Sequence, residues 1–218
     1  MELDEGLIIH LVDDSDEDLR LYRAILQNAF EQRGVPIIVE TVKARQRVGD
    51  YHDIIGDPRT AALIVDQRLG ETQWTDHTGI QLTTLLRRLV LNLPIYILTT
   101  YADVDDFQGG EWSVEDILRK EVISEPDHPD NREEFQMIME RLIRRINVHQ
   151  TILEERGRRH RELLKKSLEE QLTQEEKGEL DDLQFERTAV TLSDERDRLA
   201  RFEAALNRLD NLESGNDG

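Results

Sequence analysis

The 218-residue chain contains no cysteine, and only 5% of its residues are aromatic. Without cysteine there can be no disulfide and no site built on a thiolate. The sequence has no apolar run of about 18 residues, which a membrane-spanning helix needs. Its first residues, MELDEG, are acidic, whereas the start of a signal peptide is basic. We therefore expect a soluble cytoplasmic protein with no membrane partner.

Basic residues are also scarce, because 28 lysines and arginines stand against 47 acidic residues and leave a net charge of −19. Proteins bind nucleic acids largely by neutralising phosphates, so no nucleic-acid partner is expected. The charged fraction of 34% is above the globular average, and the hydrophobic fraction of 38% is below it. Part of the chain is therefore expected to bury little surface.

Short apolar runs that end on polar side chains recur through the first 120 residues. These runs are followed by Asp13 and Asp14, by Asp66, by Thr99, and by the adjacent pair Arg119 and Lys120. Such short, apolar runs are typical of strands buried on both faces of a parallel sheet. The last run is weaker, and the spacing leaves open which of its two basic residues matches the others.

Helical periodicity separates these strands. We predict strands at 7–12, 35–39, 61–66, 94–99 and 115–119, and helices from the acidic turn 13–18 to Gly34, at 43–55, at 79–92 and at 102–108. Ser15 or Asp14 can cap the first helix, whose acidic first turn suits its positive end. Thr78 can cap the helix at 79–92, and Pro36 favours an edge strand. This alternation predicts a parallel sheet with helices on both faces and a site at the carboxyl ends of its strands.

From Arg132 onward the pattern becomes helical throughout. Apolar residues at coiled-coil-like spacing are Phe135, Met139, Leu142, Ile146 and Leu153. Thr173 and Glu176 have the spacing of a capping box that opens a second helix. A further stripe comprises Leu199, Phe202, Leu206, Leu209 and Leu212. Helices of this kind cannot bury their stripes singly, so we expect an antiparallel hairpin, a homodimer, or both.

The side chains at the strand ends resemble those of the receiver domain of two-component response regulators. The matching residues are Asp13, Asp14, Asp66, Thr99 and Lys120, and the resemblance covers about residues 5–147. It implies a flavodoxin-like α/β fold with five parallel strands in the order 2-1-3-4-5. We accordingly expect a receiver domain at 1–147, a helical or coiled-coil output extension at 148–213 and a disordered tail at 214–218.

The resemblance also implies roles for these residues. Asp66 would accept a phosphoryl group from a sensor histidine kinase or a phosphotransfer protein. Asp13, Asp14, Asp66 and the backbone carbonyl of Arg68 would hold Mg2+, the implied cofactor. Thr99 and Lys120 would contact the phosphoryl group. The chain would then be a signalling protein and not an enzyme, with at most slow self-dephosphorylation. Its extension would signal by homodimerisation or by docking a downstream protein partner.

Three positions depart from the family pattern. Gly79 follows Asp66 by thirteen residues, whereas the family glycine follows by about eight, which indicates a short insertion around Trp74. Glu121 replaces the proline after the lysine, and Ile117 replaces an aromatic switch residue. The alternative interpretation is a pseudo-receiver scaffold that is never phosphorylated and acts as a constitutive interaction module.

Other residues have plainer interpretations. His10, inside an apolar strand, fits a core histidine better than a metal ligand. The basic run 156–166 fits a solvated helix face better than a nucleic-acid patch. A metal-dependent phosphatase would need a second aspartate two residues after Asp66, and that position is Arg68.

Overall fold

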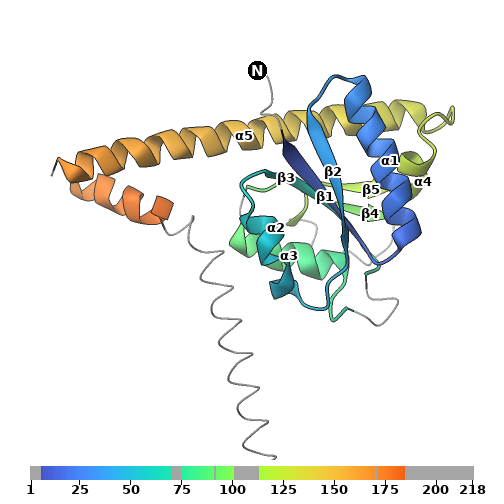
Figure 1. Ribbon diagram of the computed structural model, residues 1–218, viewed down its shortest axis with the longest axis horizontal. Helices are drawn as coiled ribbons and strands as arrows, with labels where there is room; N and C mark the ends of the chain where they lie inside the picture. Colours follow the sequence, from blue (N-terminus) through green and yellow to red (C-terminus); the bar gives the residue numbers. More distant parts are fainter. Residues whose placement is uncertain (1–5, 70–74, 91, 101–112, 170, 185–218) are drawn as a thin grey trace, which may run out of the picture.

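The computed structural model describes residues 6–69, 75–90, 92–100, 113–169 and 171–184. Within these ranges five parallel strands form one sheet in the order β2-β1-β3-β4-β5 (Figure 1). The strands are β1 (Leu7–Asp13), β2 (Ile37–Lys43), β3 (Thr60–Asp66), β4 (Ile95–Thr99) and β5 (Asp116–Arg119). The predicted fold class and strand order are confirmed.

Helices cover both faces of the sheet. One face is covered by α1 (Asp16–Gln32), α4 (Lys120–Ser124) and the first half of α5 (Arg132–Leu168). The other is covered by a 3-10 turn (Val48–Tyr51), α2 (His52–Gly56) and α3 (Gly79–Leu89). Alternate residues of each central strand enter the two cores, so that Leu11 faces α1 while Val12 faces α3. Burial on both faces explains why these strands are continuously apolar.

The local signals in the sequence have the expected structural effects. Ser15 is the N-cap of α1, and its side chain accepts a hydrogen bond from the Asp18 amide. Gly34 follows that helix with φ of 64°, a conformation in which glycine avoids a Cβ clash. Thr78 forms a capping box with Gln81 at the start of α3. As Pro36 suggested, β2 is an edge strand.

The sequence prediction was wrong between residues 35 and 55. The second strand runs from Ile37 to Lys43 rather than over 35–39, and no helix spans 43–55. The β-branched residues of IIVETVK favour extended structure over helix. After β2, only the 3-10 turn and α2 form in this segment, and α2 is five residues long. The helix predicted to end at residue 92 instead ends at Leu89.

Helix α5 is 37 residues long and continues without a break past residue 147. Four residues of the predicted coiled-coil seam, Phe135, Met139, Leu142 and Ile146, are buried against the sheet. The fifth, Leu153, is 41% exposed where α5 leaves the sheet. The first part of the stripe therefore closes the core of the sheet domain. Asn131 occupies the N-cap position, but its side chain binds the carbonyls of Glu121 and Glu125 instead of capping the helix.

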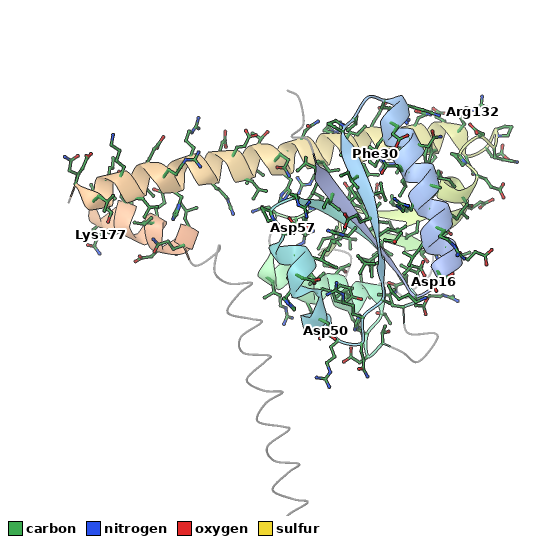
Figure 2. The ribbon with its side chains drawn as sticks, in the orientation of Figure 1. Asp16, Phe30, Asp50, Asp57, Arg132 and Lys177 are labelled. Carbon is green, nitrogen blue, oxygen red and sulfur yellow. The ribbon has the colours of Figure 1, made fainter. Side chains whose placement is uncertain are left out.

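A second helix, residues 174–184, runs back along the distal end of α5 (Figure 1). The predicted capping box is present, because the Thr173 amide binds Glu176 and the Glu176 amide binds the Thr173 hydroxyl. Arg159 of α5 donates two hydrogen bonds to Glu179, at 2.8 and 2.6 Å. Leu163 and Leu180 are buried in this hairpin. Figure 2 shows Lys177 on the returning helix, far from Asp16 and Phe30 of α1.

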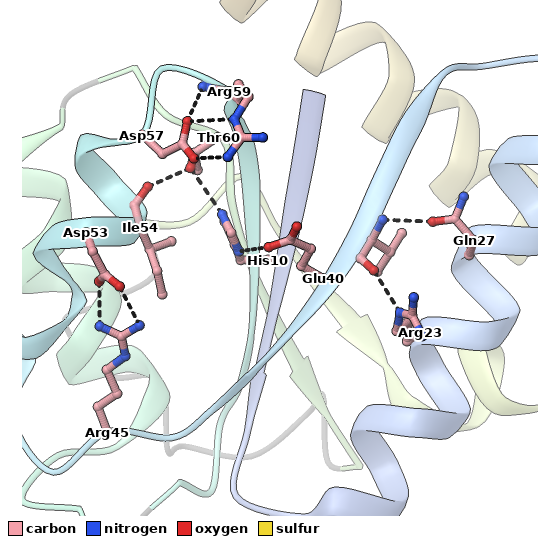
Figure 3. A network of polar contacts seen from close by, with 11 residues as sticks. His10, Arg23, Gln27, Glu40, Arg45, Asp53, Ile54, Asp57, Arg59 and Thr60 are labelled. Atoms are coloured by element: carbon pink, nitrogen blue, oxygen red, sulfur yellow. Dashed lines mark hydrogen bonds and ion pairs between the residues drawn. The ribbon is translucent and has the colours of Figure 1, made fainter. Parts of the chain in front are cut away.

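His10 belongs to a buried polar network and not to the carboxylate cluster (Figure 3). Its Nε2 lies 3.2 Å from the hydroxyl of Thr60, which donates to the carbonyl of Ile54 at 2.5 Å. Burial lowers the pKa of His10, and the nearby Glu40 opposes that shift. The interpretation of His10 as a core histidine agrees with these contacts.

Several expectations fall outside the described residues. They concern the helix at 102–108, the insertion at Trp74, the stripe from Leu199 to Leu212 and the tail at 214–218. None of the helices in the described ranges combines the length and the hydropathy that a membrane span requires.

Candidate functional site

Three carboxylates meet at the carboxyl ends of β1 and β3. Asp13 is the last residue of β1, Asp14 follows it, and Asp66 is the last residue of β3. One carboxylate oxygen from each lies within 4.8 Å of the others. Asp13 and Asp66 are almost completely buried, at 1% and 3% exposure. Neighbouring parallel strands bring these residues together although 52 positions separate Asp14 from Asp66 in the sequence.

Backbone amides orient two of the carboxylates. The Ser15 amide donates to Oδ1 of Asp13 at 2.8 Å, in the turn that starts α1. The Arg68 amide donates to Oδ2 of Asp66 at 2.8 Å, in the turn that follows β3. Each buried carboxylate therefore keeps its second oxygen for another partner. Such bonds favour the ionised form of a carboxylate and fix its direction.

Lys120 supplies the cation at this site. Its Nζ lies 2.8 Å from Oδ1 of Asp66, 3.5 Å from Oδ2 of Asp13 and 3.2 Å from Oδ2 of Asp18. Arg119, one residue earlier, forms an ion pair with Glu134 of α5 instead. Of the two basic residues between which the sequence left the choice open, Lys120 lies at the carboxylates and Arg119 lies at α5.

Burial and mutual repulsion raise the pKa of Asp13 and of Asp66. Burial, followed by the charge of Asp66, raises the pKa of Asp13 to about 6, and the Ser15 amide and Lys120 oppose it. Burial likewise raises the pKa of Asp66, against the hydrogen bond and charge of Lys120. For Lys120, burial acts to lower the pKa, but the bond to Asp66 and the neighbouring acids outweigh it and raise the pKa. One lysine thus only partly compensates the clustered acids.

The oxygen-only donor set fits a hard divalent cation. Mg2+ is usually held by one or two carboxylates plus water and phosphate oxygens. Asp13, Asp14 and Asp66 offer carboxylate oxygens close enough to share one ion. A divalent cation would offset the repulsion that raises the pKa of Asp13. These residues therefore fit the implied Mg2+ site.

Thr99 and Arg68 lie at the same edge of the sheet. Thr99 ends β4 and is buried, one residue beyond Leu98, which pairs with Asp66 across the strands. Arg68 follows Asp66 by two residues, and its amide binds the Asp66 side chain. All the residues predicted for the site thus come from segments that converge at the carboxyl ends of β1, β3, β4 and β5.

Gly79 has a steric role that its separation from Asp66 in the sequence did not indicate. A Cβ at this position would lie 2.2 Å from the carbonyl oxygen of Asp66 and 2.9 Å from Cα of Gln67. The Gly79 amide also donates to the Gln67 carbonyl at 3.0 Å. The start of α3 therefore presses on the backbone that carries Asp66, and only glycine leaves room for it.

Sequence reasoning missed the part that α1 plays at the site. From the sequence, Asp18 was expected only to be one of the acids in the first turn of the helix. In the structure Asp18 pairs with Lys120, and the ring centroid of Tyr22 lies 5.8 Å from the same ammonium group. The spacing of four residues puts both on one face of α1, which was the available signal. Their partner lies about 100 residues away, so the sequence could not name it.

Comparison with solved structures finds receiver domains. A CheY-like response regulator receiver domain from Methanospirillum hungatei is 19% identical; the match covers 63% of this chain and 94% of that one, with a TM-score of 0.44. Response regulator TrrA from Thermotoga maritima, in complex with Mg2+-BeF, is 15% identical over 62% and 97% of the two chains, with a TM-score of 0.42. A receiver domain from Clostridium thermocellum is 15% identical over 66% and 98%, with a TM-score of 0.45.

No protein-family model and no curated protein matches the sequence. Identities this low bear on the fold alone, and the fold rests on the strand order of the chain itself. Five parallel strands in the order 2-1-3-4-5 carry the acids at the ends of β1 and β3, with α1 and α5 together on one face. The chain therefore has a flavodoxin-like fold of five parallel strands, followed by a long helix in the C-terminal part.

Proposed function

We propose that this chain is a response regulator whose receiver domain takes a phosphoryl group on Asp66. The observation that carries the proposal is the 2.8 Å contact of Lys120 with Asp66 inside a cluster of three carboxylates. A cluster held together only for packing would cost stability, because buried acids of like charge repel. Perturbed acids around one lysine are typical of functional sites.

In the proposed reaction a carboxylate oxygen of Asp66 attacks the phosphorus of a phosphohistidine or of a small phosphodonor. An oxygen–phosphorus bond forms and the bond from phosphorus to the donor breaks, with its electron pair leaving on the donor. A bound Mg2+ supplies charge neutralisation during this transfer. Asp13, Asp14, Asp66 and the carbonyl of Arg68 are the residues proposed to hold the ion.

Lys120 and Thr99 are proposed to receive the phosphoryl group. Lys120 neutralises its oxygens, and the Thr99 hydroxyl at the end of β4 donates a hydrogen bond to it. Each interaction pulls a strand end toward Asp66. The resulting shift of β4 and β5 is the proposed switch.

The output is proposed to pass through α5. Arg119, which precedes Lys120, forms an ion pair with Glu134 in the first turn of α5. The Asn131 side chain ties the start of the same helix to the carbonyl of Glu121. Both chain neighbours of Lys120 thus contact the start of α5, and movement of Lys120 is proposed to reach α5 through them. We propose that residues 1–147 act as the receiver and 148–213 as an output that forms a homodimer or docks a downstream protein.

The direct test is intact-protein mass after incubation with acetyl phosphate and Mg2+. The wild type should gain one phosphoryl group, and Asp66→Asn should gain none. The matched control is Asp53→Asn. Asp53 is an exposed acid of α2 that forms an ion pair with Arg45, and its variant should behave as the wild type. A wild type that gains no mass, or an Asp66→Asn variant that still does, contradicts the proposal and favours the pseudo-receiver scaffold.

The output is tested separately, by the oligomeric state before and after phosphorylation. Light scattering of the full chain and of a chain ending at residue 148 would be compared. We expect the full chain alone to change its oligomeric state or its affinity for a partner. Equal behaviour of the two chains in both respects would rule out the output role of the extension.

A further inference from the structure

Lys120 contacts a fourth acid, Asp18, that lies outside the three-carboxylate cluster. Nζ of Lys120 is 3.2 Å from Oδ2 of Asp18, a distance between those to Asp66 and Asp13. Asp18 comes from the first turn of α1, whereas Lys120 is the first residue of α4, directly after β5. Tyr22, one helical turn beyond Asp18, places its ring centroid 5.8 Å from the same ammonium group. Lys120 is thus held from α1 as well as from the cluster.

Asp18 differs from the other two acids in its surroundings. Its side chain is 34% exposed, whereas the side chains of Asp13 and Asp66 are 1% and 5% exposed. It is also absent from the group of described residues whose oxygens could share an ion, which comprises Asp13, Asp14 and Asp66. Binding of a cation would therefore engage Asp13 and Asp66 and leave Asp18 available to the lysine.

The turn after β1 fixes Asp18 and the cluster together. The Ser15 amide binds Asp13, and the Ser15 hydroxyl accepts the Asp18 amide at 3.2 Å. One residue thereby sets the direction of a cluster acid and the position of the helical turn that carries Asp18. Ser15 therefore links Asp13 and Asp18, two of the acids that contact Lys120, through one bond from its amide and one to its hydroxyl.

We propose that Asp18 is a positioning residue for Lys120, holding its ammonium group at the site while Asp66 turns from lysine partner to phosphoryl acceptor. This inference rests on the proposed function. A lysine side chain is flexible and its ammonium can exchange partners without leaving the site. Without Asp18, Lys120 has only the two buried acids, and it then competes with the incoming cation for them. Removal of Asp18 should therefore weaken cation binding and slow phosphoryl transfer.

The test compares Asp18→Asn with a charge-matched control on the same helical turn. Asp16→Asn removes the same charge near the same helix end, but Asp16 is 74% exposed and pairs with Lys43 on the surface. Affinity for Mg2+ is measured by calorimetry, and phosphorylation by acetyl phosphate is followed by intact mass at saturating Mg2+. We expect Asp18→Asn to lower the phosphorylation rate by about twofold to fivefold, the size of a partly exposed ion pair. Asp16→Asn should change the rate by less than about twofold.

Two further variants separate positioning from a general loss of charge or of folding. Asp18→Glu keeps the carboxylate and should restore most of the rate. In a Lys120→Met background, Asp18→Asn should have no further effect on Mg2+ affinity beyond that of Asp16→Asn, because its partner is gone. Equal effects of Asp18→Asn and Asp16→Asn, or an effect of Asp18→Asn that persists undiminished without Lys120, would overturn the proposal.

The same set of variants distinguishes this inference from the proposed function. If the wild type takes up no phosphate, the proposed function fails, and the rate has no bearing on Asp18. The coupling between Asp18 and Lys120 is then read from the urea midpoints of the two single variants and the double variant. Additive shifts in these midpoints would mean that Asp18 does not hold Lys120 at all.

Discussion

Replacing Gly79 by alanine should damage both the stability of the fold and the proposed reaction. The added Cβ would lie 2.2 Å from the carbonyl oxygen of Asp66, a distance that real contacts do not allow. The atoms that this Cβ would meet belong to the backbone of Asp66 and Gln67 and not to a flexible side chain. Either α3 or the end of β3 must therefore move. Overpacking of this kind typically costs about 1–3 kcal/mol. Alanine's better helix propensity returns at most about 1 kcal/mol.

The net expectation is a loss of about 1–2 kcal/mol in the free energy of unfolding. Urea denaturation followed by circular dichroism measures this loss, and a slope of about 1–3 kcal/mol per molar converts it to a midpoint lower by roughly 0.3–2 M. The same shift displaces Asp66, and misplacement of a reacting group by about 1 Å can cost up to a hundredfold in rate. Phosphorylation by acetyl phosphate should therefore slow more than any stability loss explains.

Gly157→Ala is the matched control for this variant. Gly157 lies within α5, and a Cβ there would be 3.5 Å from the tip of the Arg161 side chain, an ordinary contact. Alanine should stabilise the helix at this position by about 0.5–1 kcal/mol. A Gly79→Ala variant as stable as the wild type and phosphorylated at the same rate would refute the steric reasoning.

Three further predictions concern pH and the hairpin. Because burial and the Asp66 charge raise the pKa of Asp13 to about 6, protons compete with Mg2+. The rise in thermal midpoint on adding Mg2+ should thus be larger at pH 7.5 than at pH 5.5; equal rises would argue against a metal site that includes Asp13. Burial, followed by the charges of nearby arginines, lowers the pKa of His149 to about 4, against a hydrogen bond with the Asn92 backbone. Stability due to neutral His149 is complete above its unfolded pKa of about 6.5 and is lost as pH falls toward 4, by up to about 3 kcal/mol; His149→Gln should flatten that fall in urea titrations. Leu163→Ala should remove about 2–5 kcal/mol of hairpin packing and speed amide hydrogen exchange in 174–184, while exposed Leu168, substituted alike, should not.

The sequence predicted the positions of the candidate site residues more accurately than it predicted the helices. Asp13, Asp66 and Thr99 end apolar runs, and parallel strands of a doubly wound sheet must bring such ends to one edge. By contrast, no helix spans the predicted range 43–55: the edge strand runs to Lys43, and only a 3-10 turn at Val48–Tyr51 and the short helix α2 follow it. Because the apolar periodicity of this segment is weak, the sequence could not distinguish one long helix from several shorter elements.

Contacts between distant segments were beyond the sequence. Whether Arg119 or Lys120 contacts the acids depends on the packing of β5 beside β4. Lys120 contacts Asp66, and Arg119 forms an ion pair with Glu134 of α5. In the sequence Asp18 is one of several acids at the start of a helix. Only the fold places Nζ of Lys120 3.2 Å from its Oδ2. Likewise the apolar stripe of α5 predicts a buried face but not its partner, which is the sheet up to Ile146 and the returning helix at Leu163.

The sequence by itself determined four of the five strands, the acids that end β1 and β3, the caps at Ser15, Thr78 and Thr173 and the start of the long helix at Arg132, because each of these depends on neighbouring residues. The tertiary structure alone decided which of Arg119 and Lys120 contacts the acids, which acid outside the cluster also contacts Lys120, and why position 79 requires glycine. Those outcomes depend on the packing of α1, α3 and β5 around one strand end, and packing brings together residues that the chain keeps far apart.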